Sequence, residues 1–167
     1  MAARWTHGIT ARKTTVSLAA ASLVLVTLIG WLSFQTYQQH QEEKRRQDIV
    51  AAARQMTVNF TSLNHRTYDK DSKNVLKSAT GEFKEQFTAQ TEELTKLVAD
   101  NKSVSEGQVL EAGIVRADKD SARVLVVADS KVANVAVPEG EARNYRLQLD
   151  LVLKDGRWLT SNVEFVG

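Results

Sequence analysis

The sequence predicts an α+β protein with a single N-terminal transmembrane helix, followed by helices packed on a curved four-stranded antiparallel sheet. Residues 14–34 form an apolar segment without a charged side chain. Apolar residues then recur at helical spacing as far as residue 98, and after residue 101 the spacing changes to the alternation of strands. Short turns separate the strand-like stretches. Short turns favour antiparallel pairing, and helices packed on such a sheet give an α+β domain.

The apolar segment TTVSLAAASLVLVTLIGWLSF, residues 14–34, is close to the roughly 20 residues that an α-helix needs to cross a bilayer. A secretory signal peptide is the alternative, but its apolar region is shorter, about 7–15 residues, and ends at a small-residue cleavage site. Here the small residues 19–21 lie inside the apolar run, and its end, residues 31–34, offers no such site. We therefore expect an uncleaved transmembrane helix.

The charges beside this segment predict its orientation. Arg12 and Lys13 adjoin it on the N-terminal side, whereas the first basic residue after it, Lys44, is distant and lies among acids. Because positive charge favours the cytoplasmic side, we expect a single-pass plasma-membrane protein with a cytoplasmic tail of residues 1–13 and an extracytoplasmic domain of residues 49–167. A stripe of small residues would let a partner helix approach closely. It consists of Ser17, Ala20, Ala21, Thr27 and Gly30.

Residues 35–48 are predicted to form a helical stalk between the anchor and the domain. They are rich in Gln, Glu, Lys and Arg, which favour helices, and no proline or glycine occurs between Gly30 and Gly81. We expect one nearly continuous helix from about Val16 to about Leu63, serving as a main docking element. The alternative is a bend near residues 35–39, where the anchor would leave the membrane.

Helical patterns continue into the domain. Residues 49–63 carry one apolar face, and a second, short helix is expected from residue 71 or 72 to Gly81, with the glycine as its C-terminal cap. A third helix follows as far as about residue 100. Its apolar stripe, which begins with Phe83 and Phe87, either belongs to the core or lines a pocket.

Four strands are predicted at residues 104–115, 122–137, 143–154 and 157–166. Gly107 and Gly113 suggest bulges or bends in the first of them. Residues 155–156, Asp-Gly, suit a type I′ hairpin turn that pairs Leu153 with Trp158. In that register Leu159, Val163 and Phe165 lie on the opposite face. Either both faces are partly buried, or a bulge near Trp158 realigns the last strand. The sequence leaves both arrangements open.

No residue set predicts catalysis, a cofactor or a metal site, and we expect no enzymatic activity. Cysteine is absent and the three histidines are scattered. His65 with Asp69 and Asp71 would make a metal site, but an exposed polar loop fits these residues better. Asp150 lies in an apolar strand, where an acid would serve as a general base in a dry pocket. Its neighbour Gln148 places it on the more polar face, so we expect solvent exposure.

The formal charge of +2 does not indicate a nucleic-acid partner. The segment before Gln41 contains Arg4, Arg12 and Lys13 and no acid. The rest of the chain is therefore nearly balanced, without the concentrated basic face that duplex binding requires.

A set of motifs runs along nearly the whole chain: the basic-flanked anchor, IVAAA at 49–53, ATGEFKEQF at 79–87, EGQV at 106–109, DGRWL at 155–159 and VEFV at 163–166. In this order and spacing they resemble the Mce-associated membrane proteins of actinobacteria. The resemblance implies a VirB8-like or NTF2-like soluble domain. It also implies an accessory or stabilising role in an Mce complex, which imports lipids such as fatty acids or sterols. The implied partners are the Mce permease, the external Mce proteins and membrane lipid.

Three other functions remain open at this point. A secretion-system scaffold of the VirB8 type would have the same architecture. A lipid-binding domain would use the hollow between helices and sheet and hand its lipid to a transporter. An NTF2-like pocket enzyme is the third. The resemblance supplies no catalytic residues.

Overall fold

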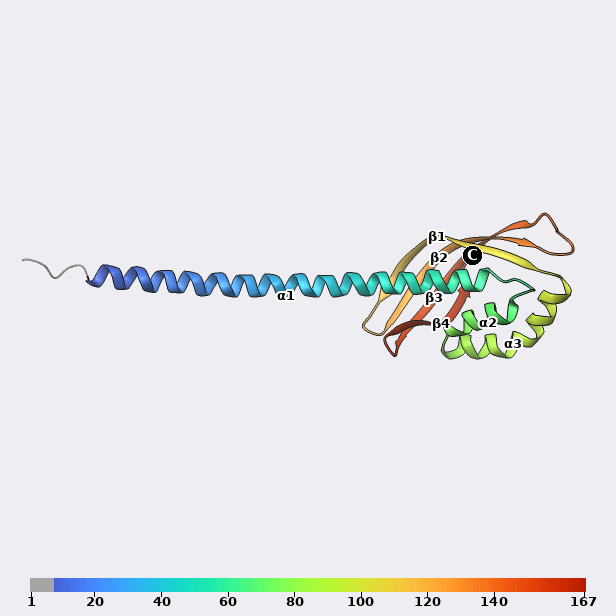
Figure 1. Ribbon diagram of the computed structural model, residues 1–167, viewed down its shortest axis with the longest axis horizontal. Helices are drawn as coiled ribbons and strands as arrows, with labels where there is room; N and C mark the ends of the chain where they lie inside the picture. The colour runs from blue at the N-terminus through green and yellow to red at the C-terminus, as the bar shows by residue number, and fades with distance from the viewer. Residues whose placement is uncertain (1–7) are drawn as a thin grey trace, which may run out of the picture. The chain divides into compact units, whose positions relative to one another are not determined.

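The computed structural model describes the backbone of residues 8–167 and the side chains of residues 28–31 and 33–167. In this part of the chain three helices precede four strands, as the sequence predicts (Figure 1). They are α1 (Gly8–Thr61), α2 (Tyr68–Lys77), α3 (Gly81–Asp100), β1 (Val104–Ala117), β2 (Ser121–Ala133), β3 (Glu141–Lys154) and β4 (Arg157–Phe165). The chain forms two compact units, one ending at Lys44 and the other beginning at Arg45.

Helix α1 is continuous from Gly8 to Thr61, so it contains all of the predicted long helix except Ser62 and Leu63. Its sequence has no proline that would break the helix. It ends where the chain turns to pair with β1: the Leu63 amide donates to Ser105 Oγ at 2.8 Å, and the Ser105 amide donates to the Leu63 carbonyl at 2.8 Å.

Among the residues with described side chains, we find no helical stretch of the length and apolarity needed to cross a bilayer. Of the predicted transmembrane segment, the side chains of residues 14–27 and 32 lie outside the described residues. The same is true of four members of the predicted partner-helix face, Ser17, Ala20, Ala21 and Thr27. The fifth, Gly30, is exposed.

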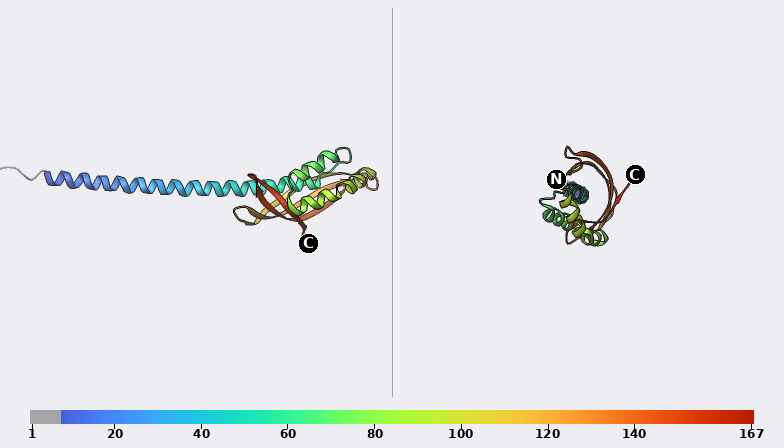
Figure 2. Two further views of the ribbon diagram at one scale, coloured as in Figure 1. Left: turned by 90° about the horizontal axis from the view of Figure 1, so that it is seen from below. Right: turned by 90° about the vertical axis from the view of Figure 1, so that its right-hand side faces the viewer.

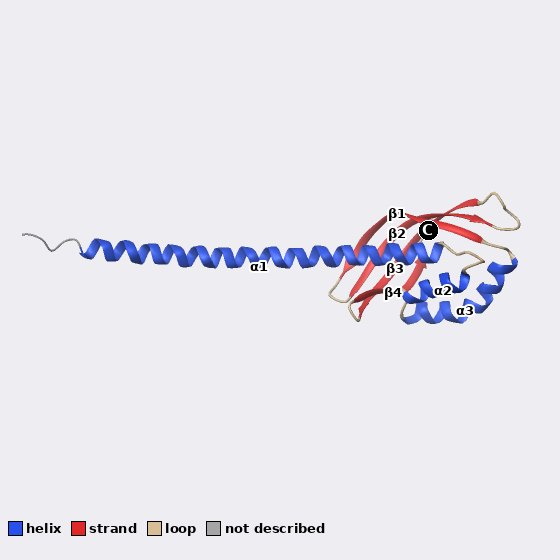
Figure 3. Cartoon of the chain, viewed as in Figure 1, coloured by secondary structure: helices blue, strands red, loops and turns tan. Residues whose placement is uncertain are grey.

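The four strands form one antiparallel sheet in the order β1-β2-β3-β4, as their short connections predict. The sheet is curved, and in the unit that begins at Arg45 the helices cover its concave face (Figures 1 and 2). Figure 3 shows the same separation of helices from strands. Strand β2 ends at Ala133, earlier than predicted, because the Asn134 side chain accepts the amides of Ala136 and Val137 and so starts a turn.

The core lies between α1 and the sheet. Ile49 and Ala53 of α1 pack against a row of buried sheet residues: Ala122, Val124, Val126, Leu147, Leu149 and Leu151. A second cluster joins the helices to one another and consists of Met56, Val75, Ala79, Phe83 and Phe87. The opposite face of the sheet is less apolar and partly solvated, and its Leu125 and Val127 are 43% and 40% exposed.

Helix α2 begins and ends earlier than predicted. Its first turn is tied by Asp71, whose Oδ2 accepts the Thr67 hydroxyl at 2.8 Å, so the helix begins at Tyr68. It ends at Lys77, because residues after it pair with β4: the Thr80 amide donates to the Thr160 carbonyl at 2.8 Å. Gly81 does not cap α2. With φ of +56° it is the first residue of α3, a conformation that glycine adopts without strain.

Strand β1 contains two irregularities, but neither is at a glycine. The register shifts between Val109 and Glu111 and between Ile114 and Arg116, so the extra residues are Leu110 and Val115. Both are exposed, by 52% and 59%. The prediction of bulges in this strand is therefore right, and their assignment to Gly107 and Gly113 is wrong.

A bulge also decides the register of the last hairpin. Leu153 pairs with Trp158, as the Asp-Gly turn predicts. The register then shifts so that Leu151 pairs with Thr160 while Asp150 pairs with Asn162, which leaves Ser161 as the extra residue. Ser161 Oγ donates to the Asp150 carbonyl at 3.1 Å. Beyond the bulge, Val163 and Phe165 pair with the core residues Leu149 and Leu147 and share their face.

Candidate functional site

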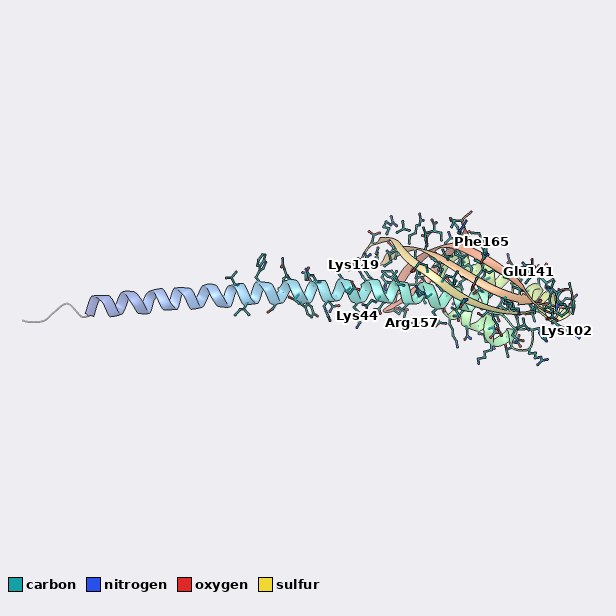
Figure 4. The ribbon with its side chains drawn as sticks, turned by 90° about the horizontal axis from the view of Figure 1, so that it is seen from above. Lys44, Lys102, Lys119, Glu141, Arg157 and Phe165 are labelled. Atoms are coloured by element: carbon teal, nitrogen blue, oxygen red, sulfur yellow. The ribbon has the colours of Figure 1, made fainter. Side chains whose placement is uncertain are left out.

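An apolar pocket of about 450 Å³ lies between the helices and the concave face of the sheet. Its walls come from the end of α1, from one side of α3, and from β1 to β4. It lies toward the end of the sheet that carries Lys102 and Glu141, opposite the end with Lys119 and Arg157 (Figure 4), because its lining includes Ser103 and Arg143. The volume falls in the range of about 300–1,000 Å³ typical of small-molecule sites.

Five aromatic side chains from four elements line this pocket. They are Phe60 of α1, Phe83 and Phe87 of α3, Tyr145 of β3 and Phe165 of β4. Their rings form a connected series: centroids lie 6.0 Å apart for Phe60–Phe83 and for Phe83–Phe87, 6.4 Å for Phe60–Phe165 and 6.3 Å for Tyr145–Phe165. The Phe60–Phe83 pair is edge-to-face, an arrangement that aromatic pairs prefer, and the other three pairs are tilted.

Helical spacing places the α3 contribution. Phe83, Phe87, Leu94 and Val98 recur at intervals that keep them on one face of the helix, and all four line the pocket. Phe83 and Phe87 also belong to the second core cluster. Phe83 and Phe87 therefore belong both to the core and to the pocket wall, so both interpretations of the apolar stripe are correct for them.

The cavity is only partly closed by apolar groups. Phe165 is 65% exposed, and Gln86 and Gln90 of α3 are exposed members of the lining. Arg143 is the one charged residue among the described residues that line it. Its Nη2 lies 3.9 Å from Glu141 Oε2, and both side chains are more than half exposed. The Arg143 charge is thus weakly paired and accessible at an otherwise apolar site.

Asp150 lies on the other face of the sheet and does not reach this pocket. It pairs across the strands with Arg123, whose Nε and Nη2 donate to its two carboxylate oxygens at 2.7 Å and 3.0 Å. The Asp150 side chain is 26% exposed, so the expectation of an exposed acid is correct only in its choice of face. The hydrogen bond from Arg123 holds the pKa of Asp150 below its ordinary value. A stably ionised, paired carboxylate is a poor general base.

His65, Asp69 and Asp71 do not form a metal site. Asp69 and Asp71 lie in the first turn of α2, rather than in the exposed loop expected from the sequence. Asp71 accepts hydrogen bonds from the Thr67 hydroxyl and the Asn64 amide, and His65 Nδ1 lies 3.3 Å from the Ser103 carbonyl. Within the described residues no group of three potential ligands gathers around a cation position.

Sequence reasoning identified two residues of the pocket and missed the others on the sheet. The helical spacing of Phe83 and Phe87 indicates them. The alternation of the predicted strand 143–154 places Tyr145 and Arg143 on one face, but does not mark them as pocket residues. Phe165 was not identifiable, because its face depends on the bulge at Ser161.

Solved structures share this fold. The structure is similar to an IcmL-like type IV secretion system protein from Legionella pneumophila, with a TM-score of 0.60 and 12% identity, covering 72% of this chain and 91% of that one. It is similar to the periplasmic domain of DotI (TM-score 0.59, 15% identity, 71% and 92% covered). It is also similar to CagV, a VirB8 homologue from Helicobacter pylori (0.56, 6%, 71% and 95%). These likenesses show that the chain shares the α+β fold of these proteins, as the resemblance implies.

The chain belongs to the family described as uncharacterized protein Rv1363c/MT1408-like, whose model matches residues 10–167. It is 34% identical over 158 residues to the uncharacterized protein Rv1363c of Mycobacterium tuberculosis. The match covers 93% of this chain and 60% of that protein, so the chain spans about 60% of the length of this relative.

Proposed function

We propose that this protein is a non-enzymatic accessory subunit that stabilises an Mce-type lipid import complex in the cell envelope. Helix α1 would anchor it in the plasma membrane through residues 14–34, with the N-terminus cytoplasmic and the domain extracytoplasmic. The proposal rests on the motifs that resemble Mce-associated membrane proteins, and on a relative from an actinobacterium, Mycobacterium tuberculosis.

The structural observation that supports the proposal is the aromatic-lined pocket of about 450 Å³. A protein that works beside a lipid transporter meets apolar substrate, and such a pocket is suited to an apolar ligand. A pure scaffold does not require one. The chemistry of the pocket therefore favours a lipid-handling complex over the alternative of a secretion-system scaffold, for which the VirB8-like fold is the supporting observation.

Helix α1 is the proposed docking element. The small residues Ser17, Ala20, Ala21, Thr27 and Gly30 would meet a helix of the permease, and the rigid stalk of residues 35–48 would hold the domain against the external subunits. Inserting a flexible Gly-Ser segment after Gln41 would interrupt the continuous helix. We expect the insertion to reduce co-purification with transporter subunits. Unchanged co-purification would place the contacts in the anchor or the domain alone.

The decisive experiment is purification of the full chain from its native membrane in mild detergent, followed by identification of bound proteins and lipids. We expect Mce permease and external Mce proteins to co-purify, and lipid uptake to fall when the gene is deleted. Recovery of secretion-system subunits in their place, with unchanged lipid uptake, would support the scaffold alternative and reject the proposal.

A further inference from the structure

The aromatic pocket has the composition of a site for an amphiphile and not for a wholly apolar molecule. Its lining includes Phe60, Phe83, Phe87 and Phe165, together with one charged residue, Arg143. Tyr145 lies two residues from Arg143 on the same strand face and contacts Phe165 through its ring. Apolar wall and cationic group are therefore adjacent.

We propose that this pocket binds a single-chain amphiphile with an anionic head group, the chain against the aromatic series and the head group at Arg143. The assignment rests on the proposed function only for the idea that lipid is nearby; the ligand chemistry comes from the pocket itself. Complementarity of charge selects an anion, because Arg143 is the charged residue of the described lining and its partner Glu141 is 3.9 Å away.

Because Arg143 is exposed, its contribution to the affinity for an anionic head group should be small. An ion pair at a solvated site contributes modestly, so the head group should alter affinity by about two- to fivefold. The alkyl chain of the ligand should contribute most of the affinity, because burying each methylene increases the affinity about fourfold until the pocket is filled. The site should thus discriminate chain length strongly and head-group charge weakly but measurably.

The test is calorimetric titration of the full chain in lipid nanodiscs with octanoate, decanoate and dodecanoate and with the matching alcohols, after subtraction of the heat from empty nanodiscs. We expect saturable binding of the acids with about fourfold tightening per methylene. Absence of saturable binding above the empty nanodisc would overturn the site.

Two variants with matched controls locate the binding. Arg143→Gln should weaken the acids about two- to fivefold and leave the alcohols unchanged. Arg146→Gln, which removes an exposed arginine that pairs with Val127 on the other face of the same sheet, should change neither. Equal loss for acids and alcohols in Arg143→Gln would overturn the assignment of the head group.

A variant that fills the pocket tests whether the alkyl chain of the ligand binds there. Gln90→Trp places a large side chain at an exposed lining position, and should abolish binding of acids and alcohols alike. Ala89→Trp, at the adjacent exposed residue outside the lining, is the control for stability and should bind as the parent does. Binding that survives Gln90→Trp would place the ligand elsewhere and reject the proposal.

The two proposals fail in different ways. Saturable acid binding without co-purifying Mce subunits would uphold the site and reject the proposed function. Co-purification with Mce subunits without acid binding would reject the site alone.

Discussion

Among the glycines that the structure describes, Gly107 has the closest neighbour to an added Cβ, and Gly107→Ala tests the packing of α1 on the sheet. A Cβ atom built at Gly107 would lie 1.9 Å from Thr61 Oγ1 and 2.6 Å from Thr61 Cβ. Thr61 is 5% exposed, and its hydroxyl donates to the Thr57 carbonyl at 2.8 Å, so it has little room to move.

The backbone of β1 is also held in place here. The Gly107 amide donates to Ser62 Oγ at 3.0 Å, and the Gly107 carbonyl accepts from the same hydroxyl at 3.4 Å. Relief of the clash must stretch these bonds or displace the end of α1. Overpacking of this kind costs about 1–3 kcal/mol, so we expect the melting temperature to fall by about 4–12 °C.

Gly113→Ala provides the matched control on the same strand. Nothing lies within 4 Å of a Cβ built at Gly113, so the substitution should be neutral or slightly stabilising. Thermal unfolding of both variants, followed by circular dichroism, measures the difference. The double variant Gly107→Ala/Thr61→Ala should recover part of the loss, because Oγ1 is removed while Cβ remains. Equal melting temperatures for Gly107→Ala and Gly113→Ala would refute the close approach of α1 to β1.

Four further predictions concern single residues and the orientation in the membrane. Trp158→Ala should lower protein abundance, because it reduces the free energy of unfolding. The reduction should be smaller than the about 3–5 kcal/mol of a fully buried tryptophan, because Trp158 is half-buried against the core. An unchanged melting temperature would mean that it does not pack there. Asp150→Asn and His65→Ala should leave lipid uptake nearly intact. The pKa of Asp150 is lowered in the folded state, so its ionised carboxylate stabilises the fold above the ordinary pKa of 3.8, and this contribution is lost as the pH falls through the lowered pKa. The difference in melting temperature between Asp150→Asn and the parent should therefore shrink in acid. A reporter enzyme active only outside the cytoplasm, fused after Gly167, should be active, and activity of a cytoplasmic reporter alone would contradict the orientation.

Most of the fold follows from local sequence patterns. Helical spacing located α1 and α3, and alternation with short turns gave four antiparallel strands in order. Element ends were less predictable, because they depend on individual side-chain hydrogen bonds close to each end. Asp71 moves the start of α2 back to Tyr68, and Asn134 ends β2 early. A sequence pattern reports which residues are apolar, not which polar side chain accepts which amide.

The role of Gly107 shows a similar limit. A glycine inside a strand indicates either a bulge or a close approach of another segment. The sequence does not distinguish them, since the second depends on Thr61, far away in the chain. The structure shows close approach at Gly107, while the bulges fall at Leu110 and Val115, which nothing in their residue types marks.

The bulge at Ser161 links this limit to the candidate site. In a regular ladder continuing from the Leu153–Trp158 pair, Val163 and Phe165 would lie on the outer face, because one residue of register reverses the side of every side chain. The extra residue returns both to the concave face, where Val163 packs against the two core clusters and Phe165 contacts Phe60 and Tyr145. The aromatic pocket therefore depends on one irregularity in β4. A sheet without it would keep its hairpin but lose the pocket wall between α1 and β3, which is why the hollow, unlike the fold class, could not be derived from the alternation of residues alone.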